Sequence, residues 1–192
     1  WMHDIERLTI DDLRAWYRTW YQPGNAILVI VGDVSLEEVR PMVDSYFGPI
    51  PAGELPPQKA PLELPGGAER NVTIEVDVQL PSLILSFNVP SLSTATEAWE
   101  VHALRLLEGV LDAGYSSRLP SRLERGSGVA TSASASYSAF SRGDTLFTLS
   151  GLPNQSRDVT LAELEAALWE QIDLLKNAPP DSAELTRIKT QL

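Results

Sequence analysis

The sequence contains no cysteine, which excludes disulfides, thiolate metal sites and cysteine nucleophiles. Histidine is almost as scarce, because His3 and His102 are the only two in the chain. Zinc peptidases of the H-E-x-x-H or H-x-x-E-H type hold the metal with two histidines one helical turn apart, and neither motif occurs. We therefore predict that this chain contributes no metal, cofactor or catalytic residue of its own, and we expect His102 to be a surface residue on a helix.

Positive charge is also sparse. The chain has 15 lysines and arginines and 26 aspartates and glutamates, so its formal net charge is −11. This balance argues against nucleic acid or an anionic membrane as a partner. No apolar run is long enough for a membrane span. The chain begins with Trp1 rather than methionine, and we therefore expect it to be a fragment of a longer protein.

A serine nucleophile is not expected either. The segment from Gly114 to Arg118 begins like the G-x-S-x-G elbow of serine hydrolases, but Arg118 stands where the last glycine should be. The segment also follows a predicted helix, whereas the elbow follows a strand. A serine hydrolase is therefore unsupported by this motif.

One stretch near the amino terminus organises the first part of the chain. Residues 23–25 read Pro-Gly-Asn and predict a turn, and residues 26–31 form an unbroken apolar run that predicts a strand buried on both faces. Gly32-Asp33 ends that strand. Ser35 with Glu38 three residues later predicts a capping box at the start of the next helix.

Two helices flank this predicted strand. Thr9 and Asp12 predict a capping box at the start of the first helix, whose apolar stripe we expect to be core: Leu13, Trp16, Tyr17 and Trp20. The second helix carries its own apolar face on Leu36, Val39, Val43 and Phe47. Pro41 lies inside it and predicts a late start or a kink.

A proline-rich stretch divides the chain. Residues 49–67 hold six prolines and three glycines without periodicity, which is typical of an extended, semi-rigid linker. We therefore predict three regions: residues 1–50, a linker at residues 51–69, and a second lobe at residues 70–192.

The second lobe shows pairs of strands alternating with helices. Strands are predicted at residues 71–80, 83–89, 129–140 and 145–152, and helices at residues 94–111, 115–125, 160–177 and from 182 onward. The helix at 94–111 is expected to turn Trp99, Ala103, Leu106, Leu107 and Val110 inward, and the helix at 160–177 is built on Leu161, Leu164, Leu168, Ile172 and Leu175. Gly143-Asp144 predicts a hairpin turn. This order predicts an α+β fold, with helices packed on one face of an antiparallel sheet.

The sequences of several motifs resemble those of one family, the inverted-motif zinc peptidases. This family includes pitrilysin, insulin-degrading enzyme, mitochondrial processing peptidase and bacterial processing-protease-like proteins. In the first part, the resemblance is carried by Tyr-x-Pro-Gly-Asn-Ala at residues 21–26, the following apolar run and Gly32-Asp33. In the second part, it is carried by Val89-Pro90, a long helix, and Gly-Tyr-Ser-Ser-Arg-Leu at residues 114–119.

The resemblance implies a clam-shaped peptidase of two halves, each with two α+β lobes, and zinc in the first lobe of one half. Residues 1–50 resemble the tail of that zinc-type lobe, and residues 70–192 resemble most of the second lobe. The zinc ligands and the catalytic glutamate would then lie outside this chain. The family's opposite half binds substrate through an arginine and a tyrosine seven residues apart, and the matching positions here are Glu124 and Thr131, so that pair is missing.

These features lead to three hypotheses. The first is the non-catalytic, chamber-forming region of a zinc endopeptidase, whose partners are peptide substrates and the other half of the enzyme, in the same chain or in a separate subunit. The second is a piece of a catalytically inactive partner or scaffold subunit of the same family. The third is an unrelated α+β binding module. We also expect self-association of the chain through exposed apolar surface, and the periplasm is favoured over the cytoplasm.

Overall fold

The computed structural model describes residues 2–57 and 68–191. The chain divides into two compact units, Trp1–Ala60 and Pro61–Leu192. Part of the predicted linker, residues 58–67, lies outside the described residues. The division of the chain at the linker into a first-lobe tail and a second lobe stays a prediction.

The first unit consists of helices and extended chain. Its helices are α1 (Met2–Glu6), α2 (Ile10–Trp20), the short turn η1 (Pro23–Asn25) and α3 (Leu36–Phe47). Both predicted capping boxes are confirmed, with Thr9 and Asp12 at the start of α2 and Ser35 and Glu38 at the start of α3. Hydrogen bonds from the cap residues lower the pKa values of Asp12 and Glu38. Helix α3 begins at Leu36 with Pro41 inside it, so of the two expected effects of this proline the late start does not occur, and the kink stays a prediction.

The buried strand predicted at residues 26–31 is wrong in this structure. The segment is extended but forms no ladder, and Ile27 and Val31 are each 92% exposed. A strand needs a neighbouring strand for its amides and carbonyls, and the described part of this unit supplies only helices and coil. The aromatic stripe of α2 is not a core here either, because the described part of this unit does not cover it. Leu13, Trp16 and Tyr17 are exposed and Trp20 is only half-buried.

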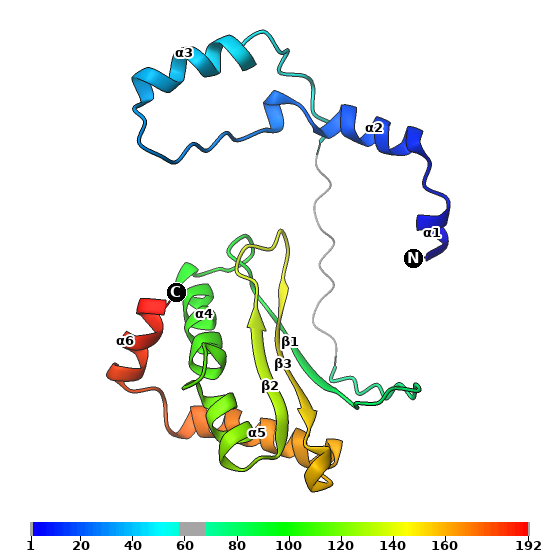
Figure 1. Cartoon of the computed structure of the whole chain (residues 1–192), viewed down its shortest axis with the longest axis vertical. Coiled ribbons are helices and arrows are strands. Elements are labelled where there is room, and N and C mark those ends of the chain that lie inside the picture. Colours follow the sequence, from blue (N-terminus) through cyan, green and yellow to red (C-terminus); the bar gives the residue numbers. More distant parts are fainter. Residues whose placement is uncertain (1, 58–67, 192) are drawn as a thin grey trace. The chain divides into compact units, whose positions relative to one another are not determined.

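The second unit is an α+β layer, as predicted. Its three strands are β1 (Leu83–Val89), β2 (Ala130–Tyr137) and β3 (Thr145–Pro153), ordered β1-β3-β2 and antiparallel throughout. Its helices are α4 (Ala98–Asp112), η2 (Pro120–Gly126), η3 (Gln155–Arg157), α5 (Leu161–Asn177) and α6 (Ser182–Gln191). Helix α4 runs beside β2, while α5 crosses the strands (Figure 1).

One face of the sheet builds the core. Side chains alternate along the strands, so that Ala133, Ala135, Phe147 and Leu149 are buried against the helices. Leu164 and Leu168 of α5 and Leu111 of α4 complete this core. The opposite face carries mainly small hydroxyl side chains, which bond to one another across the strands, as Ser134 and Ser150 do at 2.8 Å.

Several predicted details of this unit are corrected. The segment at residues 71–80 is extended and exposed and forms no strand. Helix α4 begins at Ala98, because a hydrogen-bonded turn at Ser91–Ala95 precedes it. Trp99 is 66% exposed and Ala103 is exposed as well, whereas Val101 is buried. The short helix predicted at residues 115–125 is present but begins later, because residues 113–117 form bends and a turn, and the helical stretch runs from residue 118 through η2.

Helix α5 offers a direct test of the core. Leu164 is fully buried, while Leu161 on the same helix is 39% exposed. We expect Leu164→Ala to lower the free energy of unfolding by about 2–5 kcal/mol, since it leaves a cavity in the core. Leu161→Ala should cost less than about 1 kcal/mol. Urea denaturation followed by circular dichroism measures both, and equal losses would contradict this description of the core.

Candidate functional site

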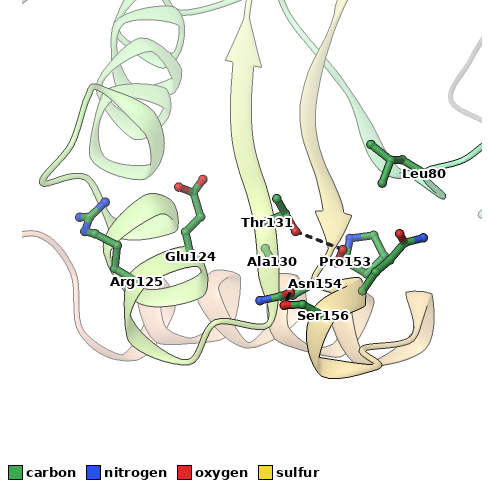
Figure 2. Close-up of a pocket in the computed structure, with 9 residues that line it drawn as sticks. Leu80, Glu124, Arg125, Ala130, Thr131, Pro153, Asn154 and Ser156 are labelled. Carbon is green, nitrogen blue, oxygen red and sulfur yellow. Dashed lines mark hydrogen bonds between the residues drawn. The ribbon is translucent and has the colours of Figure 1, made fainter.

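An open cavity of the second unit, of about 470 Å³, lies at the end of the sheet where β2 begins and β3 ends. Figure 2 shows its lining residues. They come from four neighbouring segments: Leu80, then Glu124 and Arg125 of η2, Ala130 and Thr131 of β2, and Pro153, Asn154, Gln155 and Ser156 of β3 and η3. The cavity therefore gathers residues that are far apart in the sequence.

Glu124 and Thr131, the two positions matched to the family's arginine and tyrosine, both line this cavity. The Glu124 carboxylate accepts a hydrogen bond from the Ala133 amide at 2.9 Å. The Thr131 hydroxyl donates to the Pro153 carbonyl at 3.4 Å, and it sits where the β2–β3 register shifts between Ala130 and Ser132 (Figure 2). Both side chains thus already serve the fold around the cavity.

The other polar groups of the cavity are also engaged within the protein. The Arg125 guanidinium lies 3.6 Å from the centre of the Tyr115 ring and donates to the Tyr115 carbonyl. Asn154 donates to the Gly128 carbonyl at 2.9 Å, and Ser156 donates to the Asn154 side chain at 2.7 Å. Gly128 adopts a positive φ of 67°, which favours glycine at this turn.

This set of groups shows neither a nucleophile paired with a histidine nor a zinc site. A hydroxyl nucleophile needs an adjacent base, and the cavity lining contains no histidine. Zinc needs three or four nitrogen, sulfur or carboxylate ligands, and no such group of three occurs among residues 2–57 and 68–191. The described residues do not fit a zinc site.

The residues considered from the sequence are dispersed. His3 lies in α1, and His102 is exposed on α4 beside a shallow hollow that it shares with Arg105, Leu106 and Lys189. In the elbow-like segment, the buried Ser117 hydroxyl donates to the Gly114 carbonyl. That hydroxyl stabilises a turn, whereas Ser116, which stands at the nucleophile's position of the motif, is exposed in a turn that follows helix α4 and not a strand.

An ion pair that the sequence analysis missed fixes α6. Arg118 is nearly buried and donates to both Glu184 carboxylate oxygens, at 3.0 and 2.7 Å, and to the Ala178 carbonyl at 3.2 Å. Close packing adds to it, because Gly109 of α4 lies against Ile188 of α6, and a side-chain carbon at Gly109 would come within 2.5 Å of that residue. The pair was not predicted from the sequence because its two residues are far apart along the chain.

Comparison with known proteins supplies the family. A sequence model described as the peptidase M16 inactive domain matches residues 7–192. The chain belongs to the peptidase M16 family. The resemblance to inverted-motif zinc peptidases is therefore confirmed, and this chain matches the non-catalytic domain of such a protease.

Individual M16 relatives agree with that assignment. The chain is 29% identical to zinc protease PqqE of Helicobacter pylori, over 98% of this chain and 41% of that protein. It matches the crystal structure of a protease from Helicobacter pylori at a TM-score of 0.77 and 25% identity, covering 99% of this chain and 45% of that one. The periplasmic protease PqqL from Escherichia coli shares the fold at a TM-score of 0.60 and 17% identity, with 98% and 21% covered. The chain thus spans less than half the length of these M16 relatives.

None of the helices in the described ranges combines the length and apolar character that a bilayer span requires.

The Arg118–Glu184 pair gives a test of how α6 is held. Glu184→Ala leaves a nearly buried guanidinium without its carboxylate, and we expect a loss of about 3 kcal/mol in the free energy of unfolding. The matched control is Asp173→Ala, which removes an exposed pair with Lys176 at 2.9 Å and should cost below about 1 kcal/mol. Urea denaturation measures the free energy of unfolding of both variants. If the Glu184→Ala protein is as stable as the Asp173→Ala control, the pair does not hold α6.

Proposed function

We propose that this chain is the non-catalytic, chamber-forming region of a zinc metalloendopeptidase that degrades or processes peptides. The observation that carries the proposal is the match of residues 7–192 to the M16 inactive domain. The name of the Helicobacter pylori relative, a zinc protease, supports the activity of the whole enzyme.

The chain's role would be to shape the substrate chamber and to support the other half of the peptidase, fused or as a separate subunit. Zinc would be held by residues outside this chain, in agreement with the scarcity of histidine and the absence of cysteine. Glu124 and Thr131 in place of arginine and tyrosine favour an origin in the zinc-bearing half or in a non-catalytic relative. A periplasmic location is proposed from the description of the Escherichia coli relative.

The alternative is a piece of a catalytically inactive partner or scaffold subunit of the same family. The two proposals differ in whether the protein that carries this region also carries H-x-x-E-H. Self-association of the isolated chain also stays a prediction, supported by the exposed apolar side chains of α2, α3 and residues 27–31.

A peptidase assay tests the proposal. The isolated chain should cleave a fluorogenic peptide no faster than buffer, with or without added zinc, because no set of zinc ligands occurs among residues 2–57 and 68–191. Metal analysis after dialysis against zinc should find no stoichiometric ion. Turnover that a chelator abolishes and that His102→Ala removes would contradict the proposal, since the activity would then belong to this chain. The His3→Ala variant controls for adventitious metal at an exposed histidine.

A further inference from the structure

Strand β2 lies at one edge of the sheet, since the order is β1-β3-β2. An edge strand presents alternate amides and carbonyls without a strand partner and can take up another extended chain. In β2, three such amides already have acceptors. They belong to Ala133, Ala135 and Tyr137, and they donate to the carboxylates of Glu124 at 2.9 Å, Asp112 at 3.0 Å and Glu108 at 3.2 Å.

The spacing of helix and strand explains how these bonds form in a row. Glu108 and Asp112 lie four residues apart on α4, which corresponds to a rise of about 6 Å along the helix. Their partners, Tyr137 and Ala135, lie two residues apart on β2, which corresponds to about 6.6 Å. A helix running beside the strand can therefore place a carboxylate at every second strand residue. Glu124 of η2 continues the row at Ala133, where α4 has ended.

These bonds compete directly with strand addition. An added strand would have to offer its carbonyls to the same three amides, and a carboxylate is a stronger acceptor than a neutral carbonyl. The surroundings act on the Asp112 carboxylate in both directions. Burial raises the pKa of Asp112, and the like charge of Glu124 adds to this, while the bond from Ala135 opposes both. Asp112 is thus partly removed from water, where a hydrogen bond is harder to replace.

The other edge of the sheet differs. Strand β1 is hydrogen-bonded along one side to β3. Among the hydrogen bonds within the described ranges, none joins a side chain to a backbone amide of Leu83–Val89. The carboxylates therefore distinguish β2 from β1.

We propose that Glu108, Asp112 and Glu124 close the β2 edge, so that an extended polypeptide cannot add to this strand unless the three carboxylates are removed. The occupant they exclude is a second copy of β2, which would pair antiparallel with the first. This inference rests on the hydrogen bonds of the edge and not on the proposed function.

The first test measures the bonds themselves. Amide hydrogen exchange, followed by NMR on the whole chain, should be at least tenfold faster at Ala133, Ala135 and Tyr137 in the E108A/D112A/E124A variant than in the unaltered chain. Leu149 in the central strand should be unchanged. The control variant E97A/E165A/E170A removes the same charge from side chains away from β2 and should leave all four amides as they were.

The second test measures strand addition. The chain has no cysteine, so Ser136→Cys provides a unique spin-label site on the exposed face of β2. Adjacent strands lie about 4.8 Å apart, and pairing of two β2 strands should bring two labels within roughly 20 Å. Pulsed dipolar spectroscopy should detect this distance in the alanine variant and not in the unaltered or control chains. Association through other surfaces would not produce it.

The isosteric variant E108Q/D112N/E124Q serves if the alanine variant does not fold. It preserves side-chain shape and one acceptor oxygen but removes the charge, so exchange at the three amides should rise at least threefold. Unchanged exchange in the folded variants would overturn the proposal. So would a short label distance in the unaltered chain, or the lack of one in a folded alanine variant.

Discussion

The second unit depends on its central strand. Strand β3 is hydrogen-bonded to β1 on one side and to β2 on the other, and it turns Phe147 and Leu149 into the core. Helix α5 packs Leu164 against β3 close to Gly151, where a larger residue would meet both the leucine and the Ser132 carbonyl. Without β3 neither outer strand would have a partner, and the helices would have no sheet to cover.

The same requirement explains the first unit. Residues 26–31 have the composition of a central strand, yet the described part of their unit offers no strand to pair with. Their apolar side chains remain in water, as do those of α2. The composition of a segment shows that it can form a strand, but the strand forms only where a neighbouring strand is available for hydrogen bonding. The zinc protease PqqE of Helicobacter pylori is more than twice as long as this chain and has room for such a partner strand.

Features that depend on neighbouring residues were therefore predicted well from the sequence, and contacts between residues far apart in the sequence were not. The capping boxes at Ser35 and Thr9 involve residues three apart, and β1 and β3 follow directly from their apolar pattern. The segment at residues 71–80 has an equally regular pattern but was wrongly predicted as a strand, since pairing is not a property of the segment alone. Two further sets of contacts join residues that are distant in sequence: the Arg118–Glu184 pair and the bonds from the carboxylates to β2. No local sequence pattern predicts either set. At the cavity, only the family resemblance pointed to Glu124 and Thr131.

We conclude that the sheet with its helices is self-sufficient, whereas residues 26–31 require a partner that the described chain lacks. Hydrogen–deuterium exchange of the whole chain, read by mass spectrometry, can test this claim segment by segment. Peptides from β3 and α5 should exchange slowest, while peptides covering residues 26–31 should exchange as fast as an unfolded chain. Protection of residues 26–31 equal to that of β3 would contradict the claim.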